Sequence, residues 1–253
     1  MDLGLNGRKV IVTGGTRGIG RAIVMLLAEE GVDVAFCARD PAQVEATARA
    51  VEAKGVKAEG KALDVADVDA FTAWIEEAAD RLAGVHAFIS NVSAMNSSRT
   101  AEGWRAGFQI DVLSTVMGID AAVPFLQRSG SGAIVFISST AALEKARGPR
   151  PYASVKAATM AYVSGLAREL APKGVRANTV SPGTIYFEGG GWHRREREEP
   201  EVYRTMLAEN PMGRMGRPEE VASAAVFLAS PRASFISGAN LVVDGAMTRR
   251  IQY

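Results

Sequence analysis

A tyrosine and a lysine stand four residues apart in the stretch PYASVKAA at 151–158. Spacing of four places both side chains on one face of a helix. An adjacent ammonium ion favours a phenolate, so it lowers the tyrosine pKa from about 10 toward the range that suits a general acid or base. Before this stretch, the run FISST places Ser139 at the end of a predicted strand. Its hydroxyl can bind a substrate oxygen that changes between alcohol and carbonyl, so Ser139, Tyr152 and Lys156 predict proton transfer at such an oxygen.

A glycine-rich loop, TGGTRGIG at 13–20, is the second stretch with the composition of a binding site. Residues without a Cβ allow a tight strand-to-helix turn whose backbone approaches a pyrophosphate, and the next helix offers free N–H groups and the positive end of its dipole. An ordinary glycine turn is the alternative, whereas a P-loop is excluded because no Gly-Lys-Ser/Thr follows. The loop residues expected at a dinucleotide are Gly14, Thr16, Arg17, Gly18, Ile19 and Gly20.

The end of the second predicted strand, CARD at 37–40, bears on the choice between NAD and NADP. Dinucleotide folds often carry an acidic residue about 20 positions after the loop that bonds the adenosine ribose, whereas an arginine accommodates a 2′-phosphate. Here Ala38 is small and neutral, so we expect Arg39, helped by Arg17, to bind the 2′-phosphate of NADP. NAD is the alternative, because Arg39 can be a solvated surface residue and Asp40 can cap the next helix or reach the ribose.

The elements that position these residues alternate between short apolar runs and amphipathic helical patterns. Near-continuous apolar strands, each followed by a helix, predict a doubly wound α/β fold with a parallel sheet buried on both faces. No repeat, low-complexity segment or Pro/Gly linker divides the sequence, so residues 1–253 are expected to form one domain. We expect strands at 9–14, 33–39, 57–65, 85–90, 132–139, 175–182 and 238–245, helices at 19–31, after Pro41, at 67–82, 101–128, 151–171 and near 217–229, and an irregular segment with one short helix at 184–216.

Composition and charge argue against several other classes of protein. Of 253 residues, 47% are apolar, and a net charge of +1 without a basic run gives no electrostatic reason to expect nucleic acid or an anionic membrane. Charge or glycine interrupts the apolar stretches before about 18 residues, so no transmembrane span is expected, and no signal-type segment opens the sequence. The single Cys37 cannot form an internal disulfide and fits a buried strand of a reduced, cytoplasmic protein. His86 and His193 lack metal-ligand spacing, so no metal site is expected.

As a set, these motifs resemble the short-chain dehydrogenase/reductase family, including its 3-oxoacyl-carrier-protein reductase-like members, and the resemblance covers the whole chain. Extended epimerases and dehydratases differ in the glycine spacing of the loop, and divergent enoyl reductases separate the tyrosine and lysine more widely. The motifs that carry the resemblance are TGGTRGIG (13–20), LDV (63–65), ISNVSA (89–94), FISST (136–140), YASVK (152–156), RANTVSPG (176–183) and GRPEEVASAAVFLAS…SGANLVVDG (216–245).

The resemblance implies a Rossmann-type sheet of about seven parallel strands with helices on both faces. It also implies a homotetramer that the last helix and strand help to build. In this family pattern Tyr152 exchanges the proton, Lys156 holds the nicotinamide ribose and lowers the tyrosine pKa, and Ser139 orients the substrate oxygen. The further cofactor contacts it implies are Asp64 and Val65 at the adenine, Asn91 beside the cofactor, and Pro182, Gly183 and Ile185 at the nicotinamide.

Three positions depart from the family pattern. Ser93 replaces a glycine that lets the backbone pass close to its neighbours. Asp111, in FQIDVLST, stands where the family has the asparagine of its proton relay. An aspartate there can hold the relay water, pair with Lys156 and raise the lysine pKa, or be structural. Phe187 stands where a threonine commonly contacts the carboxamide, which makes the pocket more apolar.

The segment 184–216 lies where family members carry a substrate-covering loop. Its glycines at 189–191 suit a hinge, and Phe187 and Trp192 are expected to line an apolar substrate pocket. The basic residues of HRREREE (193–199) can meet an acidic substrate, although a solvated helix face of mixed charge is the simpler interpretation.

The motifs together predict an NAD(P)-dependent oxidoreductase that interconverts a secondary alcohol and a ketone, with Tyr152 as general acid/base. The expected substrate is small to medium and mostly apolar, or an acyl thioester. One alternative is a 3-oxoacyl-carrier-protein reductase of fatty-acid synthesis. The other is a non-catalytic NADP-binding relative, which the aspartate at position 111 keeps open.

Overall fold

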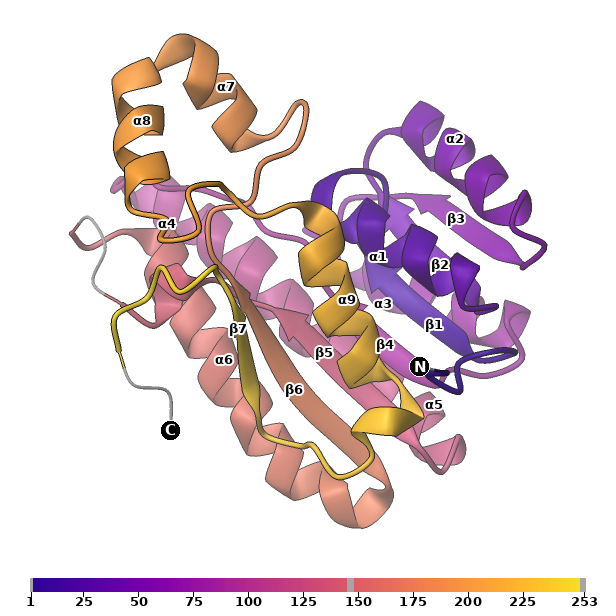
Figure 1. Ribbon diagram of the computed structural model, residues 1–253. Coiled ribbons are helices and arrows are strands. Elements are labelled where there is room, and N and C mark those ends of the chain that lie inside the picture. The colour runs from indigo at the N-terminus through magenta and orange to yellow at the C-terminus, as the bar shows by residue number, and fades with distance from the viewer. Residues whose placement is uncertain (1, 145–147, 251–253) are drawn as a thin grey trace.

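The computed structural model describes residues 2–144 and 148–250 and contains a seven-stranded sheet in the order β3-β2-β1-β4-β5-β6-β7 (Figure 1). Every neighbouring pair of strands is parallel, which confirms the predicted doubly wound α/β fold. The winding reverses between β1 and β4, and ligands of such folds bind at the carboxyl ends of the strands near this point. The strands are β1 Lys9–Thr13, β2 Asp33–Ala38, β3 Ala58–Ala62, β4 Ala87–Ser90, β5 Gly132–Ile137, β6 Val175–Pro182 and β7 Asn240–Val243.

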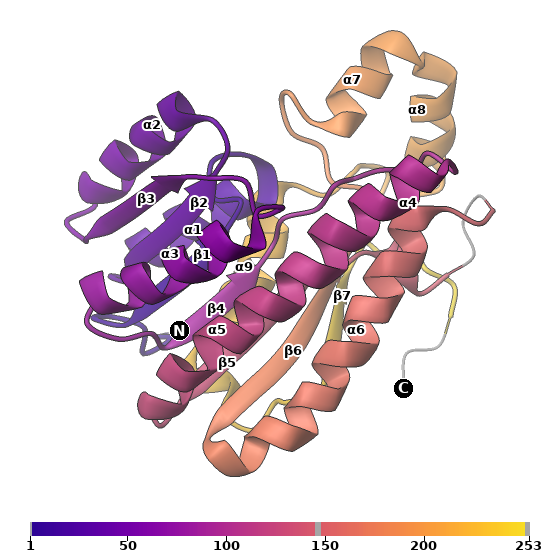
Figure 2. The same cartoon turned by 180° about the vertical axis from the view of Figure 1, so that it is seen from behind.

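Successive residues of each central strand point to opposite sides, so these strands present apolar side chains on both faces of the sheet. Helices cover both faces. Val10 and Val12 of β1 belong to one apolar core and Ile11 to the other, and all three side chains are fully buried. One face is covered by α1 (Gly18–Glu29), α2 (Pro41–Glu52) and α9 (Pro218–Ala229), and the other by α3 (Val68–Arg81), α5 (Ser114–Arg128) and α6 (Pro151–Leu170) (Figures 1 and 2).

The helix expected at 101–128 is not uniform. It consists of α4 (Ala101–Gly107), one π-helical turn at Phe108–Leu113 and α5. Such π turns are rare and concentrate at functional sites, and Asp111 lies within this one. Among the described residues, this is the one helical stretch whose length and composition would allow it to cross a membrane. In the structure its α5 part packs on the sheet between α3 and α6 (Figure 2).

The expectation of an irregular segment with one short helix at 184–216 was wrong. Two helices, α7 (Gly191–Glu198) and α8 (Pro200–Ala208), stand beyond the carboxyl edge of the sheet (Figure 1). Pro200 opens the second helix, since proline suits the first helical turn. The predicted strands 57–65 and 238–245 are shorter in the structure, because β3 and β7 are the two edge strands and pair on one side only.

Candidate active site

The residues singled out in the sequence come together at the carboxyl edge of the sheet. The glycine loop follows β1, Asn91 follows β4, Ser139 follows β5, and Pro182 ends β6. Parallel strands bring these four chain segments to the same edge, although they are far apart in the sequence.

The glycine loop has the geometry that a bound dinucleotide requires. Gly14 and Gly18 have φ angles of 72° and 51°, which side chains disfavour, and a Cβ on Gly20 would lie 2.0 Å from the carbonyl oxygen of Gly14. Arg17 is the N-cap of α1 and supplies no side-chain cap, so the first turn keeps N–H groups available for a phosphate. These features fit a dinucleotide pyrophosphate at the start of α1.

Asn91 fastens the glycine loop to the end of β4. Its Nδ2 donates to the carbonyl oxygens of Thr13 at 3.1 Å and Gly14 at 3.2 Å. The Asn91 backbone N–H donates to Thr13 Oγ1 at 2.9 Å, so each residue holds the other. The family resemblance predicted that Asn91 lies beside the cofactor. In the structure Asn91 holds the glycine loop, which is expected to bind the cofactor. Thr13 is a partner that the sequence analysis missed.

The carboxylate of Asp40 is engaged within its own helix. It caps α2 by accepting from the backbone N–H groups of Ala42 at 2.9 Å and Gln43 at 3.2 Å, and Gln43 Nε2 donates to its other oxygen at 3.0 Å. Arg39 and Arg17 are both exposed. Of the two roles considered for Asp40, the structure therefore shows the helix cap.

The remaining predicted cofactor residues lie around this edge of the sheet. Thr16 Oγ1 donates to Gln43 Oε1 at 3.2 Å, and Asp64 is exposed and accepts from the N–H of Ala66 at 3.0 Å. Ile19 is partly buried against the apolar core that contains Val10 and Val12. Val65, Pro182 and Ile185 are buried, and Ile185 also forms an isolated β-bridge to Gly216. A Cβ on Gly183 would lie 2.7 Å from the Cβ of Asp244.

Tyr152 lies in the first turn of α6 with Ser139 nearby. Burial raises the pKa of Tyr152, the charge of Asp111 raises it further, and a hydrogen bond with Ser139 lowers it. The expectation that Lys156 lowers the pKa of Tyr152 was therefore wrong for this structure. The lysine ammonium is paired with a carboxylate, so its field at the phenol is largely cancelled.

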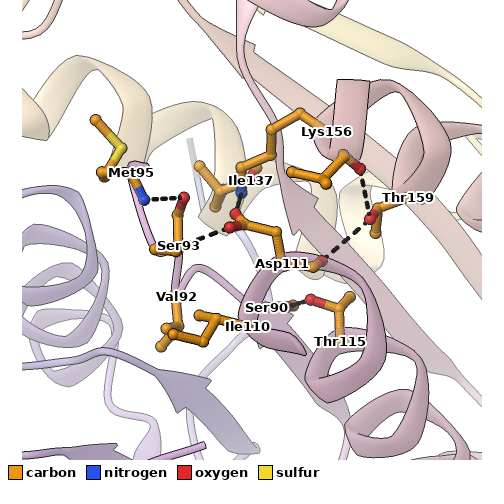
Figure 3. A network of polar contacts seen from close by, with 12 residues as sticks. Ser90, Val92, Ser93, Met95, Ile110, Asp111, Thr115, Ile137, Lys156 and Thr159 are labelled. Atoms are coloured by element: carbon orange, nitrogen blue, oxygen red, sulfur yellow. Dashed lines mark hydrogen bonds and ion pairs between the residues drawn. The ribbon is translucent and has the colours of Figure 1, made fainter. Parts of the chain in front are cut away.

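Lys156 is buried, with 2% of its surface exposed, and lies among electron-rich groups, of which Figure 3 shows Asp111 and Ile137. Its Nζ donates to the carbonyl oxygen of Ile137 at 3.0 Å, lies 3.2 Å from Asp111 Oδ1, and sits 4.8 Å from the centre of the Phe136 ring. Burial lowers the pKa of Lys156, and Asp111 raises it. Ile137 and Phe136 were not singled out in the sequence, because neither a main-chain carbonyl nor a strand phenylalanine carries a motif.

Asp111 joins three chain segments (Figure 3). Its carboxylate is 1% exposed, its Oδ2 accepts from the N–H of Ala94 at 3.0 Å, and its backbone oxygen accepts from Thr159 Oγ1 at 3.1 Å. The position of the sequence motif placed Asp111 near Lys156, and the structure does the same. Thr159 was missed, although its spacing of three from Lys156 puts both on one face of α6.

Phe187 and Trp192, the two apolar residues assigned to the substrate pocket, have different surroundings in the structure. The ring of Phe187 packs against the glycine loop, where its Cζ would lie 2.6 Å from a Cβ on Gly18. Trp192 is partly buried on α7, with the guanidinium of Arg195 5.0 Å from its ring centre. The exposed Arg194 and the partly buried Arg195 of α7 each pair with a glutamate four residues later, as expected for a helix face of mixed charge. Among the residues placed by the structure, no cluster of side chains could hold a metal ion.

The chain matches known proteins along almost its whole length. A family model described as enoyl-(acyl carrier protein) reductase matches residues 14–248. An isoepoxydon dehydrogenase of Penicillium expansum is 39% identical over 98% of this chain and 97% of its own. An acetoacetyl-CoA reductase of Synechocystis sp. is 34% identical over 97% of this chain and 98% of its own.

A solved structure of similar fold is the L-sorbose reductase of Gluconobacter frateurii, complexed with NADPH and L-sorbose. It is 28% identical and superposes with a TM-score of 0.94 over 99% of this chain and 100% of its own. The shared fold, the glycine loop and the Ser139, Tyr152 and Lys156 set agree with these matches. The chain therefore belongs to the short-chain dehydrogenase/reductase family, a family of NAD(P)-dependent oxidoreductases that act on alcohols and ketones.

Proposed function

We propose that this protein is an NADP-dependent oxidoreductase that interconverts a secondary alcohol and a ketone on a small to medium, mostly apolar substrate. The observation that carries the proposal is that Ser139, Tyr152 and Lys156 come together at the carboxyl edge of the sheet, where the glycine loop follows β1. When bound, the nicotinamide supplies or accepts the hydride.

Each of the three residues has a distinct task in this proposal. Tyr152 gives its proton to the substrate oxygen during reduction and takes it back during alcohol oxidation. The raised pKa of Tyr152 keeps its hydroxyl protonated at neutral pH, which suits the donor role. Ser139 orients the same oxygen, and its Oγ is itself held by the N–H of Ala141 at 3.1 Å. Lys156 binds the cofactor ribose.

The substrate class rests on the segment 184–216. The helices α7, which contains Trp192 in its sequence, and α8 stand beyond the carboxyl edge of the sheet, where a substrate would enter (Figure 1). A relative named as a 2,5-dichloro-2,5-cyclohexadiene-1,4-diol dehydrogenase, from Sphingobium indicum and 30% identical over 95% of this chain, favours a cyclic alcohol or ketone. The acetoacetyl-CoA reductase relative keeps a 3-oxoacyl thioester as the second candidate.

A panel of substrates tests this proposal. Cyclic, aromatic and aliphatic ketones and a 3-oxoacyl thioester are assayed with NADPH, and the matching alcohols with NADP⁺. We expect turnover of a cyclic ketone to exceed that of the thioester. Preferred turnover of the thioester selects the second candidate, and no turnover of any substrate with intact cofactor binding supports a non-catalytic relative.

We expect NADP(H) to be preferred over NAD(H) by at least about tenfold in kcat/KM, which corresponds to about 1.4 kcal/mol. Arg39 is exposed at the end of β2, and a guanidinium binds phosphate oxygens bidentately. Asp40, the carboxylate that would repel a 2′-phosphate, is occupied as the cap of α2. Steady-state kinetics of wild type and Arg39→Ala with both cofactors measure the preference, most of which the substitution is expected to remove.

The exposed Arg49 on α2 provides the matched control, because Arg49→Ala removes the same charge away from the loop and is expected to leave the preference unchanged. Equal or better use of NAD by the wild type would overturn the assignment of Arg39 and turn attention to Asp40.

A homotetramer in the cytoplasm is part of the same proposal. Leu241 on the edge strand β7 and Phe235 before it are exposed apolar side chains, which supports association through this edge. Light scattering of the purified chain measures its mass in solution, and a monomer at micromolar concentration contradicts the tetramer.

A further inference from the structure

We propose that Asp111 is a positioning residue whose two carboxylate oxygens have separate tasks, one holding Lys156 as an ammonium ion and the other holding the segment after β4. The site in this chain would then depend on a carboxylate that an asparagine cannot replace. This inference rests on the proposed function, because it assigns a state to the lysine that is proposed to bind the ribose.

The two oxygens of Asp111 face two different donors (Figure 3). Oδ2 accepts from the N–H of Ala94 at 3.0 Å, and Oδ1 lies 3.2 Å from Lys156 Nζ and has no other polar partner among the placed residues. An asparagine side chain has one acceptor oxygen and one NH₂ group, which only donates. If its oxygen kept the bond to Ala94, its NH₂ group would face the ammonium ion, so one donor would lose its partner.

The surroundings of Lys156 are those of a cation site. A carbonyl oxygen, a carboxylate oxygen and an aromatic face surround its Nζ, and each of the three favours a positive charge. Burial has the largest effect and lowers the pKa of Lys156 below its usual value, whereas the carboxylate of Asp111 opposes this shift. From α6, the titratable groups that face Asp111 are Lys156 and Tyr152, and the segment after β4 contributes the uncharged Ala94 N–H.

The backbone around Asp111 is held in place as well. The residue lies in the π-helical turn, and its carbonyl oxygen accepts from Thr159 Oγ1 on α6. Ala94 stands three residues after Asn91, which carries the hydrogen bonds to the glycine loop. Asp111 therefore connects the lysine proposed for the ribose with the segment that supports the pyrophosphate loop.

The decisive substitution is Asp111→Asn, which keeps the shape and removes the charge. The dissociation constant of NADP⁺, with no substrate present, is titrated by fluorescence between pH 6 and pH 10. Without the carboxylate the pKa of Lys156 falls, so the lysine loses its charge at lower pH. We expect the pH at which NADP⁺ affinity declines to fall by at least about one unit, a tenfold change in proton affinity equivalent to about 1.4 kcal/mol. A profile that keeps its wild-type midpoint would overturn the proposal.

The matched control is Asp69→Asn, which removes one exposed carboxylate from α3 and is expected to leave the midpoint in place. The cofactor titration does not require turnover, so it separates the two proposals. An enzyme inactive on every substrate but with the shifted midpoint would refute the proposed function and retain this inference.

Stability provides a second measurement if the variant binds the cofactor too weakly. In Asp111→Asn the folded state holds the Lys156 proton less tightly than the unfolded state, so its stability rises with pH. We expect the gap in urea midpoint between wild type and variant to narrow from pH 7 to pH 9.5. A gap that stays constant with pH would show that Asp111 acts through shape alone and would refute the charge role.

Hydrogen exchange tests the second oxygen. In Asp111→Ala the Ala94 amide loses its acceptor, and we expect faster exchange in the segment 91–95 than in Asp111→Asn, where the amide oxygen can still accept. Equal exchange in the two variants would contradict the task assigned to Oδ2.

Discussion

Replacing Tyr152 with phenylalanine is expected to lower kcat by about 10²–10⁴-fold, the usual contribution of a positioned acid or base, while cofactor affinity stays nearly unchanged. The hydroxyl is the group that exchanges the proton, whereas the ring remains and packs as before. Steady-state kinetics measure the first quantity and fluorescence titration of NADP⁺ the second. Turnover within about tenfold of wild type would contradict the role of Tyr152.

The matched control for this substitution lies on the same helix. Tyr162→Phe removes a hydroxyl that donates to Asp120 at 2.9 Å, away from the proposed site, and is expected to leave kcat unchanged.

The wild type should also show a characteristic pH dependence, since the pKa of Tyr152 is raised. Ketone reduction should persist into the alkaline range, because the phenol stays protonated there, and alcohol oxidation should rise with pH until the phenol ionises.

Replacing Lys156 with alanine is expected to abolish turnover, weaken cofactor binding and destabilise the fold. The first two effects follow because the ammonium ion is proposed to bind the ribose of the cofactor, and turnover requires the cofactor to be held in place. The third follows because Asp111 Oδ1 would be buried without a partner. Removing one partner of a buried ion pair costs about 3–5 kcal/mol of unfolding free energy. Urea denaturation and cofactor titration measure these effects.

Two further variants separate the charge of Lys156 from its size. Lys156→Met keeps most of the volume, so a similar loss of stability shows that the lost charge matters and not a cavity. Adding Asp111→Asn should recover part of the lost stability, since a neutral amide is cheaper to bury than an unpaired carboxylate. An unchanged dissociation constant for the cofactor in Lys156→Ala would count against the ribose contact, and unchanged stability would count against the ion pair.

Local sequence patterns determined the fold class and the succession of strands and helices along the chain. Continuous apolar runs such as that of β5, each followed by an amphipathic helix, allow only a parallel sheet with both faces covered. The glycine spacing at 14, 18 and 20 and the Tyr152–Lys156 pair lie within one turn or one helix, so short-range geometry was enough to indicate them.

Element boundaries and interruptions depended on neighbours that the sequence does not show. The ends of β3 and β7 were overextended because pairing at a sheet edge is decided by the adjacent strand. The π turn at Phe108–Leu113 looks like ordinary helix in its residue pattern. One short helix was expected at 184–216 instead of the two, α7 and α8, because glycine and mixed charge weakened the helical signal there.

Only the tertiary structure decided the electrostatics of the site. The sequence predicted a low pKa for Tyr152 beside Lys156, yet the ammonium ion turns to Asp111 and the carbonyl of Ile137, and burial raises the tyrosine pKa. These partners come from the π turn, β5 and α6, which meet only in the folded chain. The pKa of a buried group depends on its desolvation and on the charges around it, and neither is encoded in the spacing of a motif.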